Sequence, residues 1–332
     1  MLPMGVQTHT GELSMEEIIA YGQRAEELGY HALWPTENSG KDAMAVLAAV
    51  AARTTKLTMA TGIISVYTRT PTLMAMGIAA LDGFGERSMI LGLGSGGPGF
   101  VQQGHGLRFE RPLARVREYV SAVREFLKGD RVTVESEHFT IRRFRLRDPR
   151  PRPNVRLYLA ALGPKMTELA GELVDGIIVN LLPFASLPDL RARLAAGAAR
   201  AGRDVTAIKI CTLLMTCPDS SDPEAIDAMR KGLAFYAGQP SYEPMLACAG
   251  YRDAARAIQA AWAAKEFERA AELVTDDILA TYTLTGSERD MRAMLGKYVD
   301  EGVYPIIYPV DRPTRLKKDM LRCIELGAEL AA

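Results

Sequence analysis

Strand-type segments alternate with helix-type segments along almost the whole of this 332-residue chain. Each of eight short apolar segments is followed by residues with helical periodicity. The predicted strands are residues 4–9, 31–36, 56–64, 88–94, 155–163, 175–180, 207–215 and 303–310. This alternation is typical of parallel strands joined by helices, and eight such units predict a (β/α)8 TIM barrel.

Helix boundaries are marked clearly in the first repeats. Ser14 and Glu17 have the spacing of a capping box, and Gly29 follows the last helical position. Pro71 stands where the first turn of a helix tolerates proline. These residues predict helices directly after the first and third strands.

Two connections are too long for simple βα links. Residues 95–154 follow the fourth strand and residues 216–302 follow the seventh, so each predicts an insertion. The first contains a helical segment at 113–127 and an alternating segment at 131–146 that predicts a hairpin, whereas the second is helical. No linker composition separates these parts, so we expect one domain over residues 1–332.

A doubly wound Rossmann sheet is the alternative architecture, because Gly92, Gly94 and Gly97 spell GxGxxG after a strand. That fingerprint requires a helix to open at once, yet Pro98 and Gly99 follow. An acidic residue at the end of a second strand, about 20 residues further on, is also missing. The barrel is therefore favoured.

The composition excludes several functional classes. Lys plus Arg and Asp plus Glu are both 40, so the net charge of zero argues against nucleic acid or anionic membranes as partners. The longest apolar stretch, Ala43–Ala52, is too short to span a bilayer, and the N-terminus lacks a secretory pattern, so we expect a cytoplasmic protein. Four cysteines without a CxxC pair predict reduced core thiols and no metal site.

Two predicted strand ends are suited to an anion. Glycine-rich turns expose backbone N–H groups, and the N-terminus of a helix favours negative charge. A phosphate site between the two turns is favoured over two merely tight turns, because both lie on the face where TIM barrels carry active sites. The residues concerned are Ser95, Gly96 and Gly97 in the first turn and Leu162, Gly163, Lys165 and Met166 in the second.

The third strand ends in an unusual glycine. Gly62 lies between Thr61 and Ile63 within a β-branched run. Such a glycine indicates either close approach of a ligand to the backbone or a bend in the core, and the sequence leaves both readings open.

Other strand ends supply candidates for chemistry. Glu37 is the only carboxylate at a predicted strand end and His9 ends the first strand, so both are candidates for proton transfer or substrate anchoring, although each can equally be a structural group. Further candidates for lining a substrate pocket are Asn38, His105, Asn180 and Tyr308.

Three segments resemble the bacterial-luciferase-like superfamily of flavin and deazaflavin oxidoreductases, and most closely its coenzyme F420-dependent branch. They are ATGIISVYTRTP at 60–71, MILGLGSGGPG with HGLRFERPLARVREYV within 89–120, and LYLAALGPKMTELAGELVDGIIVN at 157–180. Together with the opening strand and LGYHALWPTEN at 28–38, the likeness covers nearly the whole chain.

The resemblance implies a TIM barrel that binds F420 and transfers a hydride between deazaflavin C5 and a C=C, C=N or carbonyl group of a small molecule. It implies a non-prolyl cis peptide bond, for which Gly62–Ile63 is the candidate, beside the cofactor ring. It also implies that Thr61, Gly62 and Ile63 and the residues of the two anion-suited turns contact the cofactor. Glu37, with His9 second, is then the predicted proton donor or substrate anchor.

The resemblance leaves alternatives open. Other members use reduced FMN and oxygen as monooxygenases, and some are non-catalytic flavin-binding partner subunits; homodimers are common. F420 has an acidic tail, for which Lys165, Arg69 and Arg108 are candidate cations. Ser65–Val66 stands where reductases of folate-like C1 carriers have Asn-Pro, and Thr36–Glu37–Asn38 stands where sugar-phosphate dehydrogenases have Asp-His, so the chain departs from both substrate patterns.

Overall fold

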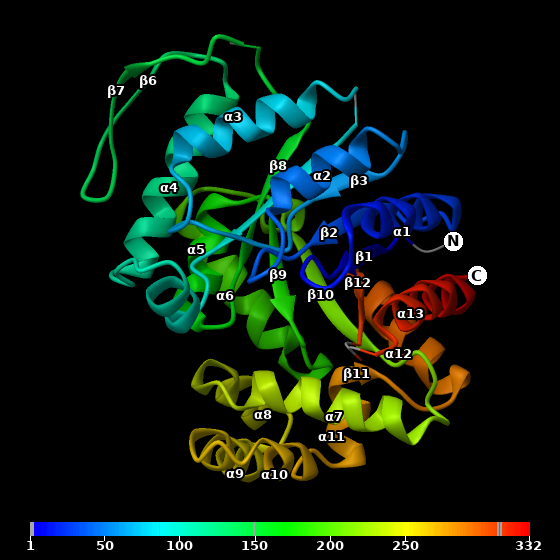
Figure 1. The fold of residues 1–332 in the computed structure, drawn as a ribbon. Helices are drawn as coiled ribbons and strands as arrows, with labels where there is room; N and C mark the ends of the chain where they lie inside the picture. The colour runs from blue at the N-terminus through cyan, green and yellow to red at the C-terminus, as the bar shows by residue number, and fades with distance from the viewer. Residues whose placement is uncertain (1–2, 86, 149, 311, 313) are drawn as a thin grey trace.

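Eight parallel strands close into a barrel in the computed structural model, which describes residues 3–85, 87–148, 150–310, 312 and 314–332 (Figure 1). Each strand pairs with two neighbours, and the pairing of β9 with β10 closes the ring. All eight predicted strands and the predicted TIM barrel are confirmed. In ring order the strands are β1 (Gly5–Thr8), β2 (Ala32–Pro35), β3 (Thr58–Ala60), β5 (Met89–Gly94), β8 (Val155–Ala160), β9 (Gly176–Asn180), β10 (Lys209–Thr216) and β12 (Val303–Pro309).

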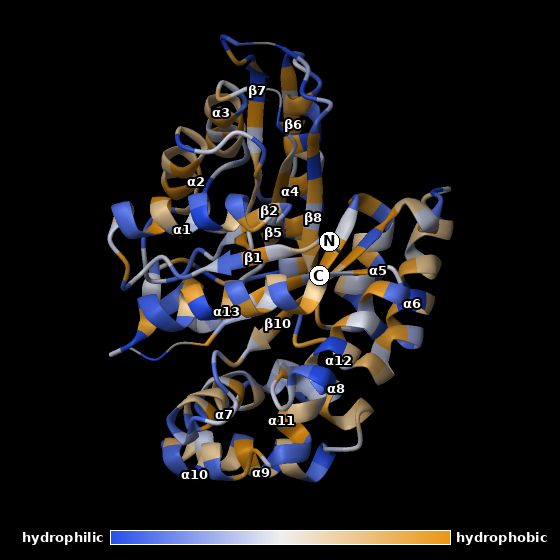
Figure 2. Cartoon of the chain, turned by 90° about the vertical axis from the view of Figure 1, so that its right-hand side faces the viewer, coloured by the Kyte–Doolittle hydropathy of each residue, from blue (hydrophilic) through white to orange (hydrophobic). Residues whose placement is uncertain are grey.

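The interior of the barrel is filled by side chains rather than open. Trp34, Tyr158 and Ile178 project into one buried cluster, with ring centroids of Trp34 and Tyr158 6.2 Å apart. A Cβ on Gly92 would lie 2.0 Å from the Thr61 carbonyl oxygen, so only glycine permits this approach of β5 to the end of β3. Figure 2 shows hydrophobic residues on strands such as β8 and hydrophilic residues on helices such as α1. The barrel core therefore holds the strand ends in fixed positions.

Helices surround the barrel and begin with the predicted caps. The Ser14 hydroxyl accepts from the Glu17 N–H and the Glu17 carboxylate accepts from the Ser14 N–H, which confirms the capping box, while Pro71 opens α3 as predicted. The surrounding helices are α1 (Met15–Glu27), α2 (Ala43–Ala51), α3 (Pro71–Asp82), α4 (Pro112–Leu127), α5 (Pro164–Leu173), α6 (Leu187–Arg200), α12 (Glu288–Asp300) and α13 (Leu316–Ala331).

The segment between β5 and β8 contains a π-helix, η1 (Phe100–Gly104), then α4 and an antiparallel hairpin of β6 (Val132–Glu135) and β7 (Thr140–Phe144). The hairpin at the predicted position packs on α4, where the rings of Phe139 and Tyr119 lie 5.7 Å apart. At its tip the His138 ring and N–H bond to the Glu118 carboxylate.

The segment between β10 and β12 is mainly helical, as predicted, and most of it lies at the end of the barrel opposite the β6–β7 hairpin (Figures 1 and 2). A two-residue strand, β11 (Thr283–Leu284), pairs with the last residues of β10 before α12 begins. The remaining elements are α7 (Pro223–Ala237), η4 (Pro240–Tyr242), α8 (Glu243–Cys248), α9 (Arg252–Ala263), α10 (Phe267–Glu272) and α11 (Asp276–Tyr282), with β4 (Ile64–Ser65), η2 (Phe184–Ser186) and η3 (Val205–Ala207) elsewhere.

The structure bears on two expectations drawn from the composition, one about membrane-spanning helices and one about the cysteines. Among the described residues, no helix is long and apolar enough to cross a membrane. Cys211, Cys217 and Cys323 are buried free thiols, but Cys248 is exposed at the end of α8, so the prediction of a core position was wrong for that residue. The short α8 helix buries Met245 and Leu246 instead.

Candidate active site

The two predicted anion turns lie at the ends of neighbouring strands β5 and β8 and are built largely from backbone. Gly96 has φ +67°, a conformation that L side chains rarely adopt, and a Cβ on Gly97 or Gly163 would meet no described atom within 4 Å. Gly163 is the N-cap of α5 and makes no side-chain capping bond, while Lys165 is exposed in the first turn. The N-terminus of α5 therefore has no side-chain cap, and the Cβ positions of Gly97 and Gly163 border open space.

Side chains around these turns are less exposed. The Ser65 hydroxyl donates to the Ser95 carbonyl at 3.0 Å, and the Ser95 hydroxyl donates to the Gly96 carbonyl at 3.1 Å. Leu162 and Met166 are half-buried against the main core. The backbone of the first turn is thereby fixed, and Leu162 and Met166 form the apolar base of the second.

The end of β3 carries the peptide bond that the resemblance implied. The bond between Gly62 and Ile63 is cis, and Ile63 packs on the cluster inside the barrel. Thr61 is fully buried, and its hydroxyl donates to the Gly92 carbonyl at 2.8 Å. This hydrogen bond lies inside the barrel and links the end of β3 to β5. The Thr36 hydroxyl donates to the Gly62 carbonyl at 2.8 Å and links β2 to this turn.

Glu37 is held by partners on both carboxylate oxygens. One oxygen accepts from the Arg69 guanidinium and the other from the Ala43 N–H at 3.1 Å. Arg69 also pairs with Asp42, and the side chains of Glu37 and Arg69 are only 10% and 11% exposed. This arrangement fits a structural ion pair. It engages Arg69, which we predicted as a candidate cation for an acidic cofactor tail.

His9 lies at the mouth between β1 and β12. Its Nε2 is 3.1 Å from the Pro309 carbonyl oxygen, and its ring centroid is 5.9 Å from that of Tyr308. Because a carbonyl oxygen only accepts, Nε2 carries the proton of this bond. In the neutral ring Nδ1 is then the basic nitrogen.

Asn180 and Tyr308 are connected through two tyrosines that the sequence analysis did not single out. Asn180 Nδ2 donates to the Tyr242 hydroxyl at 2.8 Å, and the Tyr236 and Tyr308 hydroxyls are 2.8 Å apart. The rings of Tyr236 and Tyr242 are 5.5 Å apart. We call Asn180, Tyr236, Tyr242 and Tyr308 the tyrosine–asparagine wall.

The other two residues predicted for the substrate pocket lie apart from this wall. Asn38 is exposed in the loop after β2, and His105 is exposed after η1 with its ring edge-on to Phe100 at 4.6 Å. Their place in a substrate pocket stays a prediction.

Comparison with known proteins decides the family. The luciferase-like monooxygenase family matches residues 1–304. The chain belongs to this family. The 5,10-methylenetetrahydromethanopterin reductase of Methanolobus tindarius is 30% identical over 299 residues, covering 88% of this chain and 89% of that protein. The predicted superfamily is thus confirmed.

Solved structures agree with this fold. The coenzyme F420-dependent tetrahydromethanopterin reductase from Methanopyrus kandleri superposes with a TM-score of 0.83 at 23% identity, covering 99% of this chain and 97% of that one. An F420-dependent secondary alcohol dehydrogenase in complex with an F420–acetone adduct gives 0.76 at 20% identity, covering 98% of each chain.

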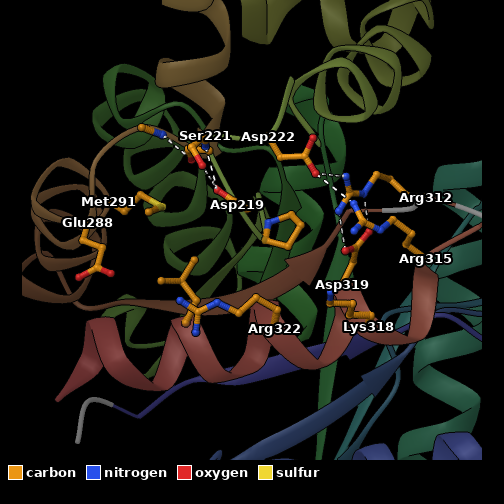
Figure 3. Close-up of a pocket in the computed structure, with 14 residues that line it drawn as sticks. Asp219, Ser221, Asp222, Glu288, Met291, Arg312, Arg315, Lys318, Asp319 and Arg322 are labelled. Carbon is orange, nitrogen blue, oxygen red and sulfur yellow. Dashed lines mark hydrogen bonds and ion pairs between the residues drawn. The ribbon is translucent and has the colours of Figure 1, made fainter. Parts of the chain in front are cut away.

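A charged cavity of about 530 Å³ in this luciferase-like barrel shares no residue with the predicted site (Figure 3). Arg312 lies between two carboxylates, with bonds of 2.6 Å to Asp319 and 2.7 Å to Asp222. Asp319 is 3% exposed, and Arg315 supplies a second cation 3.2 Å from Asp222, so the two carboxylates are balanced by two guanidinium groups. The triad joins the loop after β10 to the loop after β12 and to α13.

Proposed function

We propose that this luciferase-like protein is an F420-dependent oxidoreductase that transfers a hydride between deazaflavin C5 and a C=C, C=N or carbonyl group of a small organic substrate. The observation that carries the proposal is the pair of glycine turns at the ends of β5 and β8, the second of which begins α5 without a side-chain cap. Relatives named as F420-dependent or methanopterin reductases support the choice of cofactor and of an oxidoreductase.

The residues of the two turns fit the phosphate of such a cofactor. The space beside Gly97 and Gly163 is open, Gly96 presents its backbone without a Cβ, and the first-turn N–H groups of α5 lack a side-chain cap. Lys165 adds a cation at the same helix end. Gly96, Gly97, Gly163 and Lys165 would hold the phosphate, while Gly62 and Ile63 would lie against the ring.

When bound, the deazaflavin supplies or accepts the hydride at C5. His9 is the group of this chain that we propose to move the proton, since Nε2–H is anchored on the Pro309 carbonyl and Nδ1 takes or gives a proton. The ion pair with Arg69 makes Glu37 a positioning residue that fixes the loop between β2 and α2.

The substrate is not carried over from the relatives. Ser65 donates its hydroxyl to the Ser95 carbonyl and accepts from the Tyr67 N–H. It therefore supports the phosphate turn at the place where reductases of folate-like carriers have Asn-Pro. This departure favours a different small organic substrate.

An FMN-dependent monooxygenase is the second candidate, and the pairing of Arg69 favours it. With Arg69 bound to Glu37 and Asp42, a polyanionic tail loses one of three expected cations, whereas FMN requires only the phosphate site. A titration of the purified protein with F420 and with FMN, read by cofactor fluorescence, tests both. Saturable binding of F420 supports the proposal, and binding of FMN alone refutes it in favour of the second candidate.

A further inference from the structure

The end of β3 has a small accessible surface within an otherwise buried segment. Gly62 and Ile63 are half-buried, whereas residues 57–61 and 64–67 are buried. Gly62 packs on Trp34, because a Cβ at Gly62 would lie 3.4 Å from the Trp34 Cβ. Trp34 is fully buried, so the accessible side of this pair is the side that faces away from Trp34.

Two polar side chains from neighbouring strands hold this surface. Gln7 belongs to β1, and Thr36 directly follows β2. We propose that both are positioning residues, which keep Gly62 and Ile63 in place as the seat of the cofactor ring. The inference rests on the proposed function, because it concerns how this chain orients the ring of that cofactor.

The hydrogen bonds between these groups have only one possible direction. Gln7 Nε2 lies 3.0 Å from the Thr36 hydroxyl, which lies 2.8 Å from the Gly62 carbonyl oxygen. A carbonyl oxygen only accepts, so Thr36 gives its one hydroxyl proton to Gly62 and receives a hydrogen bond from the Gln7 amide. Gln7 is 3% exposed, and its own backbone carbonyl accepts from the Tyr21 hydroxyl at 3.1 Å. The orientation of the Gly62 carbonyl is therefore set from β1.

The backbone of the same turn is tied to the end of β2. The Gly62 N–H donates to the Pro35 carbonyl at 3.0 Å, and the Glu37 N–H donates to the Ile63 carbonyl at 3.3 Å. These two bonds lie on either side of Thr36 in the sequence. Together with the Thr36 hydroxyl they make three hydrogen bonds between the end of β2 and this turn.

A firmly held support matters for reaction at a ring. A displacement of about 1 Å far from the reacting atoms can lower a rate about 100-fold. The Gln7 side chain is buried, so it can act on the ring only through Thr36 and Gly62. Both residues are therefore positioning residues rather than catalytic ones.

Thr36 allows a matched set of substitutions. Thr36→Val keeps the shape of the side chain but removes the hydroxyl, whereas Thr36→Ser keeps the hydroxyl. Gln7→Met removes the donor to Thr36 at similar volume. Thr281→Val is the control, because the half-buried Thr281 hydroxyl also donates to a backbone carbonyl, at 2.8 Å, but does so within α11. Circular dichroism verifies that all four variants fold.

Binding is measured by fluorescence titration with F420 and with the deazaflavin ring portion alone, which lacks the phosphate and the tail. We expect Thr36→Val and Gln7→Met to bind both ligands about tenfold more weakly, because a hydrogen bond that holds the ring seat is lost. Thr36→Ser and Thr281→Val should stay within about twofold of the wild type. Gly163→Val, in the phosphate turn, should weaken the binding of F420 alone.

Hydrogen exchange tests the positioning without any cofactor. The Glu37 and Gly62 amides are hydrogen-bonded, and mass spectrometry follows their exchange in peptides that cover residues 33–40 and 58–66. Thr36→Val should speed this exchange about fivefold, since the loss of one hydrogen bond makes local opening more frequent. Thr36→Ser should exchange like the wild type.

The outcomes separate the inference from the proposed function. Unchanged exchange in both Thr36→Val and Gln7→Met overturns the inference. So does unchanged binding in these variants, an equal loss in Thr36→Ser, or a loss for F420 that spares the ring portion. No saturable binding of F420 to the wild-type chain refutes the proposed function instead, and the exchange of the cofactor-free variants still decides whether Gln7 and Thr36 hold this turn.

Discussion

The two sides of the barrel mouth are built from different groups. On the side proposed for the cofactor, at the ends of β3, β5 and β8, the main features are glycine turns. On the side proposed for the substrate, at the ends of β9, β12 and β1, they are side chains, namely the tyrosine–asparagine wall and His9. A backbone cradle suits one unvarying phosphate group, whereas a side-chain wall can change with each substrate.

The largest expected effect concerns the ion pair of Arg312 with Asp319, which joins the loop after β12 to α13. Arg312→Ala leaves the buried Asp319 carboxylate without its partner, which we expect to lower the free energy of unfolding by about 3–5 kcal/mol. Guanidinium unfolding followed by circular dichroism measures this. Arg289→Ala is the control, because its side chain is 90% exposed and should change the stability by less than about 0.5 kcal/mol. A similar small change for both would show that the triad does not anchor this side.

The cofactor side is tested by filling its cradle. Gly163→Val places a branched side chain in the open space at the N-terminus of α5, where the backbone has an extended conformation that valine adopts readily. We expect F420 affinity to fall about 100-fold, which corresponds to about 2.7 kcal/mol. Gly296→Val in α12, also beside open space, is the matched control; equal affinities in the two variants would place the phosphate elsewhere.

A single substitution distinguishes two roles for Glu37, that of a structural partner of Arg69 and that of a proton-transfer group. Glu37→Gln removes the charge paired with Arg69 and should lower the free energy of unfolding by about 1–2 kcal/mol. His9→Ala should instead reduce turnover with little change in stability. Thermal unfolding and single-turnover kinetics on each variant measure this. Loss of turnover at full stability in Glu37→Gln would return the proton-transfer role to Glu37.

The smallest expected effect is a change in how the stability of the folded chain depends on pH. Hydrogen bonding from Arg312 holds the pKa of Asp222 below its usual range. Because the folded-state pKa is lower than the unfolded one, the stabilisation is complete above the unfolded value of about 3.9 and is lost as the pH falls through the folded value. Asp222→Asn keeps the N-cap of α7 but should flatten the loss of stability as the pH falls below about 4. Parallel acid-unfolding curves for the variant and the wild-type chain would contradict this.

The contrast also explains what the sequence could predict. The eight strands, the capping box at Ser14 and the glycine turns depend on nearby residues, so periodicity and local composition were sufficient. The partners of Asn180 were not predicted, because Tyr242 lies 62 positions away and is brought to β9 only by tertiary packing. For the same reason the sequence singled out Glu37 without revealing its ion pair with Arg69, 32 positions away.

The strand β11 has a consequence for how such a protein can diversify. The Cys217 N–H donates to the Leu284 carbonyl at 3.0 Å, so the excursion that carries Tyr236 and Tyr242 leaves and rejoins the barrel at one point. Exchange of the residues between these two positions would leave every pairing of the eight-stranded ring in place. The helical segment between these two positions can therefore be exchanged as a unit without changing the strands that carry the glycine turns at the ends of β5 and β8.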